Sequence, residues 1–183
     1  LLQQLHAAPM DLDLLSQAVS RVRDAGVTTA VRVSPQNAQA LTPALVAAGI
    51  DLLVIQGTII SAERVTQGRD GSGEPLNLKT FISELDIPVV AGGVADHRTA
   101  LHLMRTGAAG VLVGFGGGAA YTSRSVLGVA VPMASAVSDV AGARRDYLDE
   151  SGGRYVHVIA DGSVLRSGDI AKAIACGADA VMV

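Results

Sequence analysis

A glycine-rich run over residues 113–120, Val-Gly-Phe-Gly-Gly-Gly-Ala-Ala, is the segment that most strongly suggests chemistry. It leaves an apolar stretch that is typical of a buried strand. Because glycine has no side chain and adopts left-handed backbone angles, successive N–H groups in such a run can turn toward one anion. The run therefore indicates binding of phosphate, or of an ion by the backbone, with a flexible lid or a tight turn as the alternative. It is not a Walker loop, because no Gly-Lys-Ser/Thr follows it.

A second candidate is the sequence Ala160-Asp161-Gly162-Ser163, which follows the apolar residues 155–160. A carboxylate at the end of a strand can accept hydrogen bonds from two hydroxyl groups, such as those of a ribose. A plain Asp-Gly turn is the alternative. Just downstream, Ser167 is predicted to cap the next helix and Asp169 to stabilise its first turn, which needs no functional explanation.

The other reactive residue types do not form a recognisable site. His97 and His102 are five residues apart, on different faces of a helix, so a zinc site is not predicted. Cys176 is the single cysteine and is expected at a helix end away from the glycine run, as a small core residue. The charged residues within 144–150 are predicted to form a solvated helix face.

A weak repeat organises the chain: a helix, a glycine, one or two residues, and then a β-branched run. The glycine closes the helix in a left-handed conformation, so each repeat predicts a junction from helix to strand. The predicted strands are nearly continuous in Val, Ile and Leu, as in a parallel sheet that is buried on both faces. They cover residues 28–33, 52–55, 88–91, 111–113, 155–160 and 180–183. Apolar stripes predict helices at Leu12, Leu15, Val19 and Val22, and at Leu101 and Met104.

The long connections, residues 56–76 and 114–131, follow strands and not helices. In a (β/α)8 TIM barrel, the loops after the strands build the active site. We therefore predict an α/β fold, a (β/α)8 TIM barrel of which this chain holds about six β/α units. An open doubly wound sheet is the alternative, because it uses the same alternation. Residues 1–183 are expected to be one partial barrel domain, truncated at both ends.

The composition excludes several kinds of partner. Aromatic residues make up 3% of the 183 residues, the net charge is -3 and no basic run occurs, so nucleic acid is not an expected partner. Each apolar stretch is interrupted before the roughly 18 residues that a membrane-spanning helix requires, so no membrane association is expected. The single cysteine and the lack of a signal-peptide pattern favour a cytoplasmic location.

Five segments resemble, in their order and spacing, the IMP dehydrogenase and GMP reductase family: residues 113–124, 128–132, 160–162, 167–173 and 177–183. The resemblance is strongest to the actinobacterial paralogues of that family whose activity is uncertain, and it covers nearly the whole chain. It implies a (β/α)8 barrel whose third to eighth strands lie here. It also implies a purine nucleotide substrate (IMP or GMP), hydride transfer between purine C2 and NAD or NADP, and a homotetramer.

The resemblance carries specific positions onto this sequence. Nucleotide-binding positions fall on Gly117, Gly118, Ala119, Asp161, Gly162 and Ser163. Positions near the dinucleotide fall on Gln56 and Gly93. A monovalent cation, K+, is held in the family by backbone carbonyls that correspond to Gly116, Gly118 and Tyr121.

The chain departs from the family pattern at its centre. The catalytic cysteine position is Tyr121, and a phenol with a pKa of about 10 cannot simply replace a thiolate nucleophile. Thr122, the next residue, is the remaining candidate for a catalytic role. Ala119 replaces a phosphate-binding serine, Gln56 a carboxylate and Gly93 an asparagine. Three hypotheses stay open: an oxidoreductase of purine nucleotides, a non-catalytic nucleotide-binding barrel with a regulatory or assembly role, and a phosphate-binding barrel that uses flavin.

Overall fold

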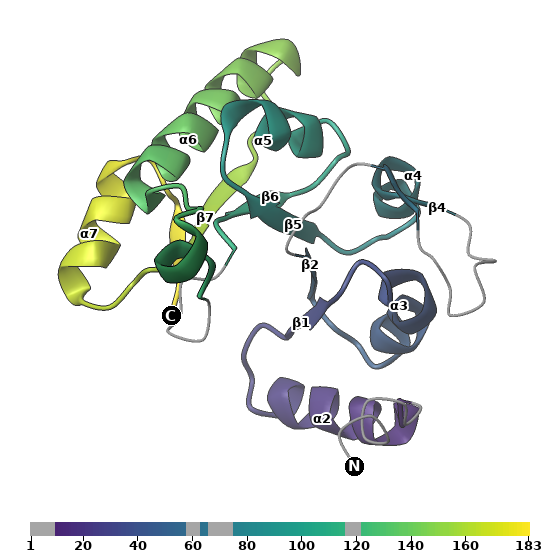
Figure 1. The fold of residues 1–183 in the computed structure, drawn as a ribbon. Coiled ribbons are helices and arrows are strands. Elements are labelled where there is room, and N and C mark those ends of the chain that lie inside the picture. Colours follow the sequence, from purple (N-terminus) through teal and green to yellow (C-terminus); the bar gives the residue numbers. More distant parts are fainter. Residues whose placement is uncertain (1–9, 58–62, 66–74, 116–121) are drawn as a thin grey trace.

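The computed structural model describes residues 10–57, 63–65, 75–115 and 122–183 (Figure 1). Its main sheet has six strands in the order β1-β2-β5-β6-β7-β8, and every neighbouring pair is parallel. The strands are β1 Ala30–Val33, β2 Leu52–Gln56, β5 Val89–Val94, β6 Gly110–Val113, β7 His157–Asp161 and β8 Ala180–Met182. A doubly wound sheet would reverse its strand order at a switch point, whereas this order follows the chain throughout. The fold is a curled, parallel half-barrel, which confirms the predicted partial TIM barrel.

Helices form an arc around the outside of the curled sheet (Figure 1). They are α2 Leu12–Asp24, α3 Ala38–Ala47, α4 Leu78–Ser83, α5 His97–Met104, α6 Met133–Glu150 and α7 Ser167–Ala175. Helix α2 begins where the Asp11 carboxylate accepts hydrogen bonds from the N–H groups of Asp13 and Leu14, at 3.0 and 3.1 Å. Such a cap satisfies backbone donors that the helix itself leaves without partners.

The core lies between the sheet and this arc of helices. Leu53 and Ile55 of β2 and Val111 and Val113 of β6 are fully buried, and they pack with α5 residues such as Leu103. The predicted burial of both strand faces holds for β5 and β6, whose residues are all buried. It is wrong for β1, β2, β7 and β8, where burial alternates, because only their outer face packs against helices of the described chain.

The two long connections after strands contain structure that the sequence did not predict. The first includes an antiparallel pair, β3 Glu63–Val65 with β4 Pro75–Asn77. The second includes a π-helical turn, η1 Ser123–Leu127, which ends at Gly128 in a left-handed conformation with φ of 67°. Both segments extend from the carboxyl ends of strands, where a TIM barrel builds its site.

Two local predictions need correction, and the first concerns the start of α7. Its cap is Arg166, not Ser167, which is already the first helical residue. Asp169 provides the stabilisation, because its carboxylate accepts the N–H groups of Leu165 and Arg166 at 3.1 and 3.0 Å. These N–H groups would otherwise lack partners at the helix start.

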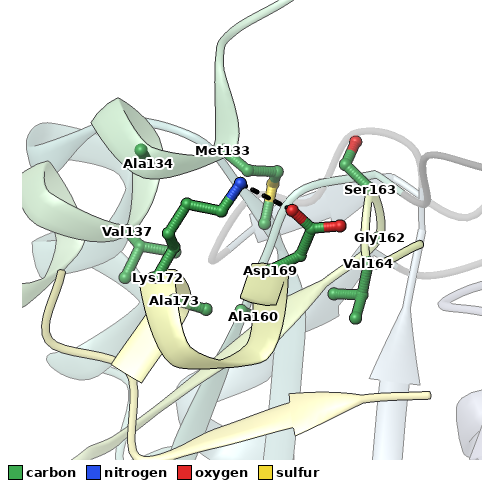
Figure 2. A pocket seen from close by; sticks show the side chains of 10 residues that line it. All are labelled: Met133, Ala134, Val137, Ala160, Gly162, Ser163, Val164, Asp169, Lys172 and Ala173. Carbon is green, nitrogen blue, oxygen red and sulfur yellow. Dashed lines mark ion pairs between the residues drawn. The ribbon is translucent and has the colours of Figure 1, made fainter. Parts of the chain in front are cut away.

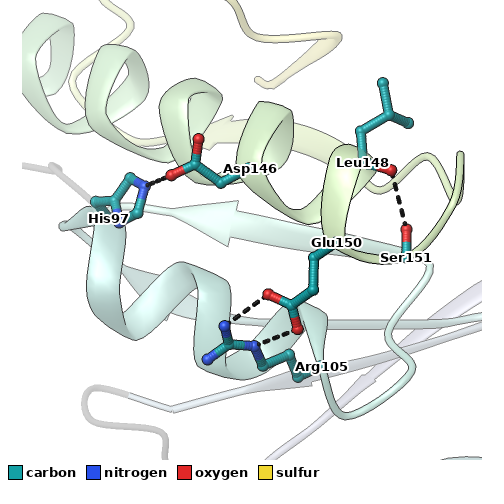
Figure 3. Close-up of polar contacts among 6 residues, drawn as sticks. All are labelled: His97, Arg105, Asp146, Leu148, Glu150 and Ser151. Carbon is teal, nitrogen blue, oxygen red and sulfur yellow. Dashed lines mark hydrogen bonds and ion pairs between the residues drawn. The ribbon is translucent and has the colours of Figure 1, made fainter.

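The second correction concerns the charged face of α6, which is not solvated throughout. Its outer residues pair with α5, as Figure 3 shows: Asp146 contacts His97 at 2.7 Å, and Glu150 accepts two hydrogen bonds from Arg105, at 2.8 and 2.6 Å. Arg144 is largely buried, because only 15% of its side chain is exposed. Its guanidinium donates to the Asp179 carboxylate at 2.7 Å, just before β8. Side-chain ion pairs therefore connect helix α6 to its neighbours on both flanks.

Candidate functional site

The best-formed polar cluster lies at the carboxyl ends of the strands. Gln56 is the last residue of β2 and Asp161 is the last residue of β7, 105 residues further along the chain. The side-chain amide of Gln56 donates, through Nε2, a hydrogen bond to Oδ2 of Asp161. The side-chain amide oxygen of Gln56, Oε1, accepts a hydrogen bond from Nη1 of Arg32, in β1, at 3.1 Å. Since β5 and β6 separate β2 from β7 in the sheet, this chain of contacts crosses the mouth of the half-barrel.

The strand register explains why these side chains meet. Gln56 pairs with Gly92 of β5, Gly92 with Leu112 of β6, and Leu112 with Ile159 of β7. Paired residues share a face of the sheet, and Asp161 lies two residues beyond Ile159, on that same face. The curl of the sheet then brings the two ends of the row together. Gln56 and Asp161 are accordingly half-buried on the inner side of the barrel.

Asp161 lies in an environment with opposing effects on its charge. Burial raises the pKa of the carboxyl group, while the hydrogen bond from Gln56 and the charge of Arg32 work in the opposite direction, and the net result is a raised pKa. A half-buried carboxylate that loses solvation needs donors to stay ionised. Gln56 supplies one donor, and a ligand with hydroxyl groups would supply more.

Glycines bring the adjoining strand ends into close contact. Gly93 is the extra residue of a β-bulge, and a Cβ atom there would overlap the carbonyl oxygen of Gly114. A Cβ on Gly114, whose φ is +101°, would overlap the carbonyl oxygen of Asp161. No side chain fits at either position without a backbone shift. Gly93, predicted near the dinucleotide, therefore contributes close packing, and the asparagine that the family pattern has there does not fit this backbone.

A small pocket of about 130 Å³ lies beside the end of β7, between the first turns of α6 and α7 (Figure 2). Gly162 and Ser163, two of the predicted nucleotide-binding residues, line it. Ser163 has a left-handed backbone with φ of 58°, which is uncommon for a residue other than glycine and is often found at functional sites. Lys172 and Asp169, from the same turn of α7, line one side of this pocket and form an ion pair of 2.6 Å, drawn as a dashed line in Figure 2.

Several predicted residues lie outside the described part of the chain: Gly116, Gly117, Gly118, Ala119 and Tyr121. Thr122 is described and is exposed at the start of η1, where its carbonyl oxygen accepts from the N–H of Val126 at 2.8 Å. Within the described residues, no general base forms a hydrogen bond with its hydroxyl group. An isolated hydroxyl is a weak nucleophile. The proposed catalytic role of Thr122 stays a prediction.

The family model of the IMP dehydrogenase / GMP reductase domain matches residues 16–183, which is most of the chain. The chain belongs to the IMP dehydrogenase/GMP reductase family. An uncharacterized oxidoreductase of Mycolicibacterium smegmatis is 76% identical over the whole chain, and one of Mycobacterium leprae is 72% identical. The chain spans 48% of the length of each. The inosine-5′-monophosphate dehydrogenase of Pasteurella multocida is 41% identical over 86% of this chain and 29% of its own length.

A solved structure of the same family has the same fold. The IMP dehydrogenase/GMP reductase-like protein from Corynebacterium glutamicum superposes with a TM-score of 0.87 and is 59% identical. The match covers all of this chain and 46% of that protein. Membership of the IMP dehydrogenase/GMP reductase family and the half-barrel geometry thus agree.

Metal ligands do not cluster within the described ranges. No group of three or more His, Cys, Asp or Glu side chains there could hold a metal ion. The K+ site predicted from the family falls on residues outside those ranges and stays a prediction. Among the described helices, none is both long and apolar enough to cross a membrane.

Arg32 is the site residue that the sequence analysis missed. It is a charged residue in the middle of an apolar strand, between Val31 and Val33. A charged residue between two apolar strand residues is unusual, and this pattern could have marked Arg32 for attention, although the structure leaves its side chain exposed. Its partner, Gln56, was not evident from the sequence because the two lie on different strands.

Proposed function

We propose that the full-length protein is an oxidoreductase of purine nucleotides, which transfers a hydride between purine C2 of IMP or GMP and NAD or NADP. The observation that carries the proposal is Asp161, a half-buried carboxylate at the end of β7, oriented by Gln56 toward the mouth of the half-barrel. A carboxylate in that position suits the two hydroxyl groups of a ribose. Family membership over residues 16–183 supports the purine nucleotide as the ligand.

The predicted dinucleotide contacts fit less well. The amide oxygen of Gln56 is bonded to Arg32, an N–H of the amide is bonded to Asp161, and Gly93 has no side chain and no room for one. These two positions therefore offer no free carboxylate or amide pair for a nicotinamide dinucleotide. We assign no step of the reaction to them, and NAD or NADP enters the proposal through the family alone.

The test combines turnover with binding. Full-length protein is offered IMP with NAD and, separately, GMP with NADPH, and formation or loss of the reduced nicotinamide is followed by absorbance. Calorimetry then measures nucleotide affinity for the wild type and for Asp161→Ala. Losing hydrogen bonds to a charged group costs about 1.5–3 kcal/mol, so affinity should fall by roughly 10- to 100-fold. Asp146→Asn, an exposed carboxylate on the outer side of α6, is the matched control and should bind as the wild type does.

A second candidate, a non-catalytic nucleotide-binding barrel with a regulatory or assembly role, is favoured by one observation. The catalytic cysteine position is Tyr121, and Thr122 has no base beside it within the described residues. Nucleotide binding that Asp161→Ala weakens, without turnover in either direction, would select this candidate. Absence of nucleotide binding by the wild type would reject both.

A further inference from the structure

Three residues from three strands form one directed chain of hydrogen bonds. The guanidinium of Arg32 donates to the amide oxygen of Gln56 at 3.1 Å, and the amide N–H of Gln56 donates to Oδ2 of Asp161. Since Arg32 has only donors, it fixes which end of the amide faces β1 and so turns the NH2 group toward Asp161. The orientation of Gln56 is therefore determined from both sides.

Among the described residues, these hydrogen bonds engage only one of the two carboxylate oxygens of Asp161. Oδ2 accepts from Gln56, whereas no donor within the described residues reaches Oδ1. A carboxylate held by one oxygen cannot rotate freely, so its second oxygen points in a defined direction. Pre-organisation of this kind lowers the cost of ordering when a ligand binds.

We propose that Arg32 and Gln56 are positioning residues, which orient the Asp161 carboxylate for a ligand with neighbouring hydroxyl groups. The inference rests on the proposed function for the identity of that ligand and adds the residues that prepare its site. It also gives Gln56 a role other than contact with the dinucleotide. The side-chain amide of Gln56 hydrogen-bonds to Asp161 and so links the guanidinium of Arg32, on β1, to the carboxylate at the end of β7.

The charges around Asp161 make the arrangement sensitive to substitution. Arg32, from β1, is the charged side chain that opposes the effect of burial on the carboxylate. From the α7 side, Lys172 and Asp169 line the adjoining pocket, but they are paired with each other at 2.6 Å. No other charged group among the described residues acts on Asp161. Removing Arg32 therefore raises the pKa of Asp161 further, and the carboxylate loses its charge at a higher pH.

The experiment uses full-length Arg32→Met, which keeps a long apolar side chain and removes the donors and the charge. Affinities for IMP and for 2′-deoxy-IMP are measured by calorimetry across the pH range. Both nucleotides carry the same phosphate, so the deoxy nucleotide corrects for phosphate titration. We expect the preference for IMP to fall about fivefold to tenfold at acidic pH and to recover as the pH rises, with Arg32→Lys restoring much of it. Arg105→Met, which breaks an exposed ion pair on α5, should leave the preference unchanged.

Two results of the binding experiment would overturn the inference. An equal loss for both nucleotides at every pH, not rescued by Arg32→Lys, would show that Arg32 acts only on folding. A preference that Asp161→Asn abolishes while Arg32→Met leaves intact would show that Asp161 works without this chain, and the proposed function would survive. Titration of the Asp161 carboxyl by carbon NMR in ligand-free protein gives a readout that needs no nucleotide. An unchanged Asp161 pKa in Arg32→Met would contradict the inference even if the proposed function failed separately.

Discussion

Replacing Gln56 by glutamate exchanges the side-chain amide for a carboxylate, which turns an attractive contact with Asp161 into a repulsive one. The native amide N–H donates to the Asp161 carboxylate, whereas the introduced carboxylate would place a second negative charge beside it. Two unit charges about 4 Å apart repel by about 4 kcal/mol at an effective dielectric constant of about 20. Arg32, which already donates to the side-chain oxygen of Gln56, would pair with the introduced carboxylate and offset part of this repulsion. We therefore expect the carboxyl pair to keep its last proton to a higher pH than Asp161 alone does.

The free energy of unfolding of Gln56→Glu should fall, relative to the wild type, as the pH rises. A carboxyl group whose pKa is raised in the folded state contributes stability that is complete at acidic pH and is lost as the pH rises through the folded-state pKa. Gln56→Glu should therefore be less stable than the wild type by about 1.5–3 kcal/mol at about pH 8, with the difference shrinking toward about pH 4. Urea unfolding of full-length protein at several pH values measures this difference. Gln56→Met removes the hydrogen bond without adding charge, so its deficit should vary less with pH.

This prediction would be contradicted if Gln56→Glu were less stable than the wild type by the same free energy of unfolding at every pH. The side chain at this position would then not face Asp161 in solution, and the chain of contacts across the barrel mouth would be wrong. A deficit that grows toward acidic pH would contradict the sign of the argument. It would mean that the introduced carboxylate is attracted by a cation more strongly than Asp161 repels it.

Two further predictions concern parts of the fold that support the site. Asp179→Ala removes the acceptor of Arg144, of a tyrosine hydroxyl and of a β7 N–H, and should cost about 2–4 kcal/mol in urea unfolding. Burial acts to raise the pKa of Asp179, but these donors lower it on balance, so the deficit should narrow as the pH falls through that pKa; a deficit unchanged at low pH would contradict this. Gly114→Ala places a Cβ against the carbonyl oxygen of Asp161 and should destabilise the protein by more than about 2 kcal/mol, whereas Gly128→Ala, with a positive φ but open space, should cost about 1 kcal/mol. Equal losses in the two alanine variants, measured by thermal unfolding, would argue against close packing at Gly114.

The sequence predicted the barrel because its strands follow a rule that acts locally. A glycine such as Gly49 or Gly177, each with a positive φ in the structure, closes a helix just before a β-branched run. The lengths of the connections then predicted which end of the barrel carries the site. The β3–β4 pair was not predicted, since its short strands contain charged and polar residues without an apolar pattern.

The site was predicted only in part, for a physical reason. Asp161 was predicted as a site residue from its place at the end of a strand, which is a local feature, and Ser163 from the family resemblance. The contact between Asp161 and Gln56 depends on how strongly the intervening strands curl the sheet, and no local pattern encodes that curl. Arg144 was misassigned for the same reason, because its partner Asp179 lies 35 residues away, just before β8.

A crystal structure of the full-length protein with IMP bound tests the central claim most directly. The account predicts that the ribose hydroxyl groups lie about 2.5–2.9 Å from the Asp161 carboxylate, while Gln56 still donates to Oδ2 and accepts from Arg32. A nucleotide bound with its ribose away from the end of β7, or an Asp161 that faces solvent with Gln56 turned toward the dinucleotide, would contradict it.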